Sequence, residues 1–250
     1  MTRRGVIETI NWNAADTLTA LESAELDRLS ESAGMPVRDL MEFAGWQCAR
    51  WIAAQCGDPT NHGPHIGIIV GLGNNGGDGL VAARYLFDWG YSVEVMCMGE
   101  ESRMKTLPHE HLVRARHEGI RVEDVLATEH ELQSMFMGGI LVDAILGTGS
   151  VLPLRSEVAH ACRLLNKMHA RHLAIDAPTG VDSTTGDRDA DAFRADATLC
   201  LAAPKSGCGV TDCWGTVYVA DLPIPQSAWK ALGKTRPVDR GRIVQLVISR

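Results

Sequence analysis

The stretch HIGIIV, residues 65–70, and GLGNNGGDG, residues 71–79, together decide the fold of this chain. The first six residues form a short apolar run, which is typical of a buried strand. The next nine form a glycine-rich loop with the pattern GxGxxG starting at Gly71, and we expect a helix to begin near Asp78. A plain connection needs far fewer glycines. A strand, such a loop and the free N–H groups of a helix N-terminus predict a site for a nucleotide-like anion.

Short apolar runs continue to alternate with helical patterns after this stretch. Helices are expected at 80–89 and 156–169. Near-continuous apolar strands alternating with helices are typical of an α/β fold with a mostly parallel, doubly wound sheet. The expected strands are His65–Val70, Ser92–Met98, Gly139–Leu146, His172–Ile175, Thr198–Leu201 and Thr216–Val219, with a possible edge strand at Ile243–Ile248.

Capping residues and apolar spacing predict the structure near the two ends of the chain. Residues 1–18 are expected to be a flexible extension, and residues 19–250 a single domain. Thr19 and Glu22 have the spacing of a capping box at the start of a short amphipathic helix. A second helix follows from Pro36, and a short one is expected near Ser227–Leu232.

Composition excludes several classes of function. The 250 residues are 45% hydrophobic and 22% charged, and the net charge is -7. An acidic domain is a poor partner for nucleic acid or an anionic membrane, and there is no apolar run of about 20 residues that could span one. The seven cysteines are odd in number and lack a CxxC pair. We therefore expect free thiols and a cytoplasmic protein, with mitochondrial targeting left open by the two N-terminal arginines.

Three polar residues follow strands at the edge where parallel sheets bind ligands. Asp143 lies inside an apolar run, so it must be bound to a cation or fully hydrogen-bonded. Asp176 ends the next strand, where it can act as a general acid or base, or cap the following segment. Lys205 follows the fifth strand and would contact either a phosphate or solvent.

Several ordered motifs resemble the NAD(P)H-hydrate epimerase family, also called the YjeF N-terminal domain family. The similarity covers about residues 20–225, and its most characteristic element is GNNGGDGLVAAR from Gly73. It departs at Phe43, Thr179 and Ser156, where the family often has Asn, Ser and Gly. The other matching segments are residues 23–26, 40–42 with 44–45, 142–144 with 147–149, 153–155, 176–180 and 203–205.

The resemblance implies a three-layer α/β/α, Rossmann-like fold and interconversion of the R and S epimers of NADHX and NADPHX, the hydrated nicotinamide cofactors. It implies a potassium ion (K+) held by Asn75, Asp143 and Thr179, and Asp176 as the catalytic residue. The ATP- or ADP-dependent dehydratase domain of fused bacterial proteins is not expected within 250 residues. The implied substrate contacts are Asn74, Asn75, Gly76, Gly77, Asp78, Gly147, Thr148, Gly149, Ser150, Val151, Leu152, Pro153 and Asp176, to which the strand-end pattern adds Lys205.

The resemblance also implies a homodimer. Trp46 and Trp51 on the second helix are five residues apart, so burying both predicts a second surface. Two other functions stay open. One is a non-catalytic nucleotide-binding or scaffold module on the same fold. The other is an NAD-dependent oxidoreductase, which the GxGxxG pattern permits, with Glu94 or Glu100 placed to bind a ribose.

Overall fold

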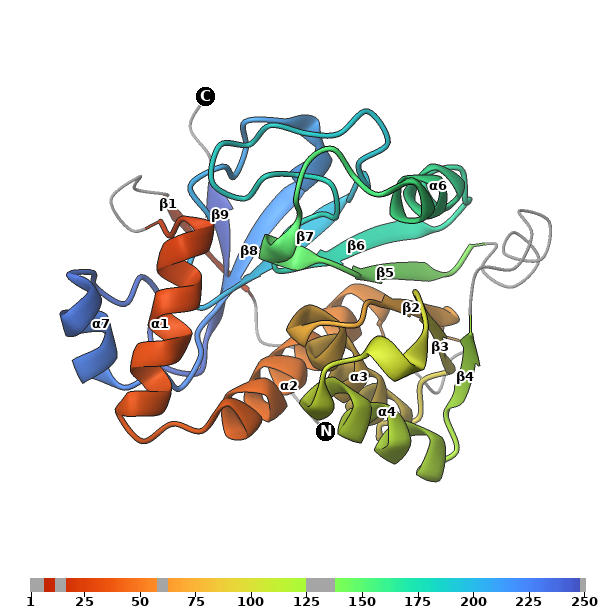
Figure 1. Cartoon of the computed structure of the whole chain (residues 1–250), viewed down its shortest axis with the longest axis horizontal. Helices are drawn as coiled ribbons and strands as arrows, with labels where there is room; N and C mark the ends of the chain where they lie inside the picture. The colour runs from red at the N-terminus through yellow and green to blue at the C-terminus, as the bar shows by residue number, and fades with distance from the viewer. Residues whose placement is uncertain (1–6, 12–16, 58–62, 125–137, 248–250) are drawn as a thin grey trace.

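The computed structural model describes residues 7–11, 17–57, 63–124 and 138–247 (Figure 1). The strands in these ranges form one nine-stranded sheet in the order β1-β9-β8-β7-β6-β5-β2-β3-β4. Every neighbouring pair is parallel except β8 and β9. The predicted mostly parallel sheet is therefore confirmed. The strands are β1 (Glu8–Asn11), β2 (Ile66–Val70), β3 (Val93–Cys97), β4 (Arg121–Asp124), β5 (Ile140–Ala144), β6 (Arg171–Ile175), β7 (Ala197–Leu201), β8 (Thr216–Ala220) and β9 (Ile243–Val247).

Helices cover both faces of this sheet. In Figure 1, α2, α3 and α4 lie on one side of β5, β2 and β3, and α6 lies on the other. Helices α1 and α7 pack together beside the β8–β9 end. This confirms the three-layer α/β/α arrangement. The helices are α1 (Ala20–Ser32), α2 (Val37–Cys56), α3 (Asn74–Asp88), α4 (Thr106–His117), α6 (Ser156–Leu165) and α7 (Gln226–Leu232).

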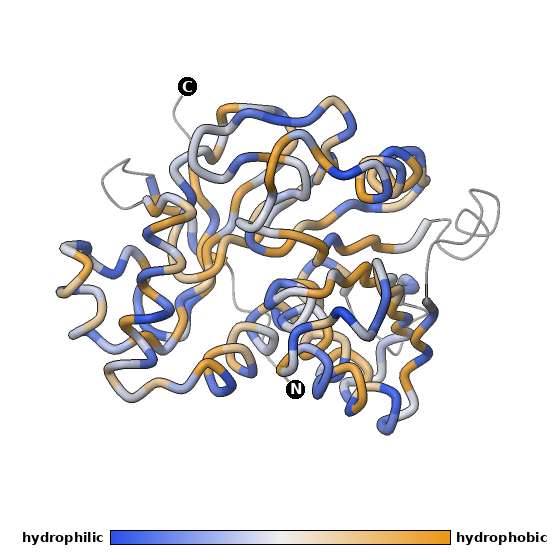
Figure 2. Tube along the Cα trace, in the orientation of Figure 1, coloured by the Kyte–Doolittle hydropathy of each residue, from blue (hydrophilic) through white to orange (hydrophobic). Residues whose placement is uncertain are grey.

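The central strands are mostly apolar because both of their faces are covered. Ile68 of β2 belongs to the core that includes Trp51 of α2. Its neighbour Ile69 points the opposite way, into the core that includes Leu165 of α6. Apolar colour accordingly runs along β2 and β5 in Figure 2. Among the described residues, no helix is long and apolar enough to cross a membrane.

The edges of the sheet correct the sequence prediction. Part of the supposed flexible extension, Glu8–Asn11, forms β1, which pairs with β9 as the edge strand. Residues Ile243–Val247 are therefore an inner strand rather than an edge, and Ile248 lies outside the described residues. Leu18 is also docked, since it is 1% exposed and its N–H donates to Pro204 O at 2.9 Å. Such long-range pairing leaves little local signal in the sequence.

Helix α3 begins at Asn74 rather than near Asp78, so the glycine-rich loop is only residues 71–73. Glycine is a poor helix former, and tertiary packing overrides that preference here. A Cβ at Gly76 would lie 2.0 Å from Gly71 O, and one at Gly79 would lie 2.6 Å from the Ala144 Cβ. These glycines let the helix approach its own turn and the sheet.

Candidate active site

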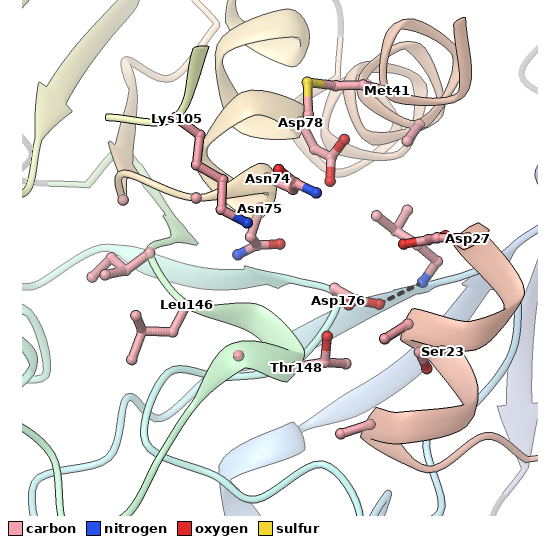
Figure 3. A pocket seen from close by; sticks show the side chains of 18 of the residues that line it. Ser23, Asp27, Met41, Asn74, Asn75, Asp78, Lys105, Leu146, Thr148 and Asp176 are labelled. Atoms are coloured by element: carbon pink, nitrogen blue, oxygen red, sulfur yellow. Dashed lines mark hydrogen bonds between the residues drawn. The ribbon is translucent and has the colours of Figure 1, made fainter. Parts of the chain in front are cut away.

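A cavity of about 440 Å³ opens at the carboxyl ends of the central strands (Figure 3). Its walls come from the turns after β2, β5, β6 and β7 and from helices α1 and α2. This is where an open parallel sheet binds ligands, and the volume is in the range of small-molecule sites, about 300–1,000 Å³. Among the predicted substrate contacts, those that line the cavity are Asn74, Asn75, Asp78, Thr148, Gly149, Asp176 and Lys205.

The N-terminus of α3 faces this cavity. Gly73 caps the helix, and the first hydrogen bond inside it runs from Gly77 N to Gly73 O at 3.1 Å. The three preceding N–H groups therefore have no partner within the helix, and the helix dipole adds partial positive charge there. A Cβ at Gly73 would meet nothing within 4 Å. This end of α3 can hold an anion, with open space over Gly73.

Other predicted contacts do not line the cavity. Gly76 and Gly77 are buried, and a Cβ at Gly77 would lie 2.5 Å from the Met41 sulfur. We expected these glycines to admit a ligand, whereas their closest neighbours are parts of the protein itself. Gly147 has φ 56° and abuts the Asn75 side chain, and Val151 is 77% exposed. With Ser150, Leu152 and Pro153, these residues lie outside the lining, and their contacts with substrate stay predictions.

Asp176 and Lys205 form a buried ion pair in the cavity wall. Lys205 Nζ lies 2.7 Å from Asp176 Oδ1 and donates to Leu201 O at 3.0 Å. Lys205 is 2% exposed, which excludes one of its two predicted alternatives, a solvated loop lysine. Burial is the largest influence on the pKa of Lys205 and lowers it. The charge and hydrogen bond of Asp176, together with Cys200 and Cys208, outweigh burial, so the pKa of Lys205 is raised. The lysine therefore stays charged beside Asp176, and the two side chains form an ion pair.

The backbone directs Asp176 into the cavity. It has φ 69°, a left-handed conformation that few residues other than glycine adopt, although Asp tolerates it better than most. Its Oδ1 accepts a hydrogen bond from Leu201 N at 3.1 Å, which ties it to β7. That contact replaces the predicted alternative of a cap for the following segment. Backbone strain of this kind is frequent where a side chain must be held for a task.

Two further carboxyl groups share the cavity with Asp176 (Figure 3). Burial, reinforced by Asp176 and Asp27, raises the pKa of Asp78 well above its usual value. Asp27 is an exposed residue of α1, although protein atoms of the cavity wall surround much of its carboxyl group. Its pKa rises to about 6, mainly by that enclosure and then by the charge of Asp176, while Lys205 opposes the rise. Sequence reasoning assigned no role to Asp27.

Two cationic residues missed by sequence reasoning also line the cavity. Lys105 precedes α4, and Figure 3 shows its side chain extending into the cavity on the side away from Asp27. Arg155 precedes α6. Both lie away from the strand ends. Arg155 belongs to the family-like segment 153–155, whereas the sequence signal for Lys105 is its place directly before a helix.

The three predicted metal ligands meet at one turn. Their side chains accept hydrogen bonds from three consecutive backbone N–H groups, those of residues 145–147. Ile145 N donates to Asp143 Oδ1 at 3.0 Å, and Leu146 N donates to Thr179 Oγ1 at 3.1 Å. The Asn75 amide is oriented by its neighbours so that its oxygen accepts from Gly147 N and its nitrogen donates to Ile175 O, both at 3.2 Å. Thr179 also donates to Asp143, through its backbone N–H at 2.7 Å and its hydroxyl at 2.8 Å.

The donor set suits a hard monovalent cation. Asp143 is 1% exposed, and burial raises its pKa to about 6 despite the hydrogen bonds from Thr179 and Ile145. No ion pair to Asp143 occurs among the described residues. Carboxylate, hydroxyl and amide oxygens around one uncompensated charge are the chemistry that hard cations prefer. Within the same part of the chain, no three His, Cys, Asp or Glu side chains gather as a transition-metal site requires.

Comparison with known proteins gives consistent matches. A family model described as "YjeF-related protein N-terminus" matches residues 37–207. The chain is 33% identical over 212 residues to the NAD(P)H-hydrate epimerase of Rhodopirellula baltica, covering 83% of this chain and 84% of that protein. It is 34% identical over 234 residues to the bifunctional NAD(P)H-hydrate repair enzyme Nnr of Pyrobaculum aerophilum, covering 87% of this chain and 44% of that protein. The chain thus spans less than half of this bifunctional relative.

A solved structure supports the fold independently. The crystal structure of the yeast protein ynu0 (YNL200c) superposes with a TM-score of 0.77. The two chains are 24% identical, and the match covers 92% of this chain and 99% of the yeast chain. At that identity the likeness concerns the arrangement of strands and helices alone.

Proposed function

The chain belongs to the family of YjeF-related protein N-termini, and from that premise we propose that it is an NAD(P)H-hydrate epimerase, an isomerase that interconverts the R and S epimers of NADHX and NADPHX. The observation that carries the proposal is the buried Asp176–Lys205 pair. It places a charged carboxylate, fixed by φ 69° and by Leu201 N, in the wall of a cavity that the N-terminus of α3 also faces.

The reaction needs little more than proton transfer to and from the oxygen on one carbon. The substrate carries a hydroxyl on C6, next to the ring nitrogen. When an acid protonates that hydroxyl, the C6–O bond breaks, water leaves, and the nitrogen lone pair forms a C=N bond to the resulting cation. Water then adds to the other face and gives a proton to a base. Asp176 takes part as an acid–base group, and such help contributes about 10²–10⁴-fold to a rate.

Substrate binding uses the start of α3 and the residues around it. The free N–H groups at the start of α3 suit the pyrophosphate, because several fixed donors and a helix dipole favour an anion. Asn74, Asp78, Thr148 and Gly149 line the same space. Lys205 acts here through Asp176, since its ammonium group is engaged by that carboxylate and by Leu201 O.

We also propose that Asn75, Asp143 and Thr179 hold K+ beneath the cavity. The support is the buried charge of Asp143 and the gathering of the three side chains on residues 145–147. When bound, the ion would supply positive charge that neutralises Asp143. The residues themselves fix the turn that leads to Thr148 and Gly149, and through Asn75 they connect it to the first turn of α3.

The remaining expectations stay proposals with partial support. A homodimer is favoured by Trp46, which is half-buried, contacts Phe43 with ring centroids 5.3 Å apart and lies under Arg50. Trp51 gives no such support, since it is fully buried in the core against Tyr218. The seven cysteines are all free, which suits a cytoplasmic protein. Residues 19–250 are proposed as a single domain.

The test is an epimerisation assay on the purified protein. Pure (R)-NADHX is incubated with and without protein in potassium buffer, and the two epimers are separated by chromatography. We expect equilibration well above the uncatalysed rate, and a loss of about 10²-fold or more for Asp176→Asn. An Asp176→Asn protein that equilibrates the epimers at the wild-type rate would eliminate the assignment.

The alternatives give different outcomes in the same preparation. A non-catalytic binding module would bind an adenine dinucleotide in calorimetry and leave the epimers at the uncatalysed rate. An NAD-dependent oxidoreductase would change NADH absorbance with a carbonyl substrate. The cavity holds an Asp–Lys pair and additional carboxyl groups, a set that suits proton transfer to oxygen.

A further inference from the structure

Helix α1 is clamped onto the loops that follow β6 and β7. Thr19 caps it with a full capping box. Ala20 N donates to the Thr184 hydroxyl at 2.9 Å, across 164 residues of chain. Leu18, just before the helix, exchanges two backbone hydrogen bonds with the Lys205 loop, one to Pro204 O at 2.9 Å and one from Ser206 N at 3.0 Å. The position of α1 relative to the Asp176–Lys205 pair is therefore fixed by direct contacts.

This clamp places Asp27 in the cavity wall. Figure 3 shows the carboxyl groups of Asp27, Asp78 and Asp176 directed into one cavity from three elements, α1, α3 and the end of β6. Among the described residues, no hydrogen bond or ion pair holds the Asp27 carboxyl group, in contrast to Asp176. Asp27 is an exposed residue of α1, so its carboxyl group is open to a ligand that enters the cavity.

Epimerisation offers a role for such a group. The departing and the returning oxygen lie on opposite faces of the ring, so one carboxylate on one side cannot reach both. We propose that Asp27 is a second catalytic acid–base group, which serves one face of the ring while Asp176 serves the other. The inference rests on the proposed epimerase function and deepens it.

The protons balance with two carboxyl groups that share one proton. The protonated group donates to the C6 hydroxyl, the C6–O bond breaks and water departs as the nitrogen lone pair forms the C=N bond. A second water, oriented by the ionised group on the other face, attacks C6 and loses a proton to that group. One proton has then moved from one Asp to the other, and the reverse reaction or exchange with solvent resets them.

The surroundings of the Asp27 and Asp176 carboxyl groups differ as this scheme requires. Asp176 is paired with Lys205, whereas the surrounding protein atoms and the charge of Asp176 raise the pKa of Asp27 to about 6. The other charged or titratable groups that face the cavity are Asp78 from α3, Lys105 before α4 and Arg155 before α6. The active form carries one proton on the pair, so kcat/KM should fall as pH rises above about 6 in both directions of reaction alike.

The experiment compares Asp27→Asn with Glu31→Gln, which removes the same charge from an exposed position on α1 outside the cavity lining. We expect Asp27→Asn to lower kcat by about 10²-fold or more and to abolish the fall in kcat/KM above pH 6, while Glu31→Gln keeps the wild-type profile. Calorimetric titration with NAD+ checks that the Asp27→Asn cavity is intact, with an affinity within about threefold of wild type, a change of under 1 kcal/mol.

The outcomes separate this inference from the proposed function. If the wild type does not epimerise NADHX, both fail. If the wild type is active and Asp176→Asn is not, but Asp27→Asn keeps the wild-type kcat and pH profile, the epimerase stands and the role of Asp27 is overturned. If Asp78→Asn instead abolishes the fall above pH 6, the second acid–base group is Asp78 and the inference is likewise wrong.

Discussion

Replacing Lys205 by Met tests the central ion pair of the cavity. The change keeps an unbranched apolar chain of similar length and removes the ammonium group. Asp176, whose side chain is only 14% exposed, then loses its charge partner, and Leu201 O loses a hydrogen-bond donor. Breaking a buried pair from one side costs about 3–5 kcal/mol. Because water partly reaches Asp176, we expect about 3 kcal/mol, the lower end of that range.

Urea denaturation at pH 7 measures the loss. With a slope of about 3 kcal/mol/M, the midpoint of Lys205→Met should fall by about 1 M. The raised pKa of Lys205 means that its contribution is present below the ordinary lysine range and is lost only as pH rises through the folded-state pKa.

A double variant separates charge compensation from packing. Lys205→Met combined with Asp176→Asn leaves no buried charge, so it should recover most of the stability lost in the single variant. The reasoning is refuted if the Lys205→Met midpoint lies within about 0.2 M of wild type, or if the double variant is less stable than Lys205→Met alone.

Three further predictions follow from the same walls of the cavity. Gly76→Ala places a Cβ 2.0 Å from Gly71 O and should lower the free energy of unfolding by about 1–3 kcal/mol. Gly73→Ala should melt like wild type but bind NAD+ more weakly in calorimetry, because a Cβ there meets no protein atom within 4 Å. Equal melting temperatures for the two variants would contradict this. Wild type should melt higher in potassium chloride than in tetramethylammonium chloride, and Asp143→Ala should lose that difference; the same response in both proteins would exclude the ion site. Asp27 has a folded-state pKa raised to about 6, so it favours folding at low pH and loses that contribution as pH rises through 6. Asp27→Asn should therefore gain stability relative to wild type between pH 5 and pH 7, and a constant difference in scanning calorimetry would rule this out.

The layers of the fold could be predicted from the sequence because the apolar central strands by themselves indicate a sheet covered on both faces. The strand Ile66–Val70 is apolar at every position, because Ile68 and Ile69 belong to cores on opposite faces and only a sheet covered on both sides buries both. The same reasoning located the site. Ligands bind at the carboxyl ends of parallel strands, so Asp143 and Asp176 could be selected as soon as their strands were recognised.

What the sequence missed depends on contacts between distant segments. The start of α3 could not be placed because its glycines disfavour a helix locally and are there for close approach to Gly71 and Ala144. Lys205 looks like any loop lysine until Asp176 and Leu201 surround it. Asp27 enters the cavity only because α1 is clamped to a loop 164 residues further along the chain.

The clamp on α1 has a consequence for synthesis on the ribosome. A chain emerging from its N-terminus presents Leu18 and Ala20 long before their partners near Thr184 and Pro204 exist. A further contact, from Lys234 Nζ to Thr17 O at 2.9 Å, spans 217 residues. Contacts of such separation form late, because closing the loop costs entropy before any contact is gained. The nascent protein therefore completes the turn before α3 early, and its cavity gains the α1 wall only when most of the chain has left the ribosome.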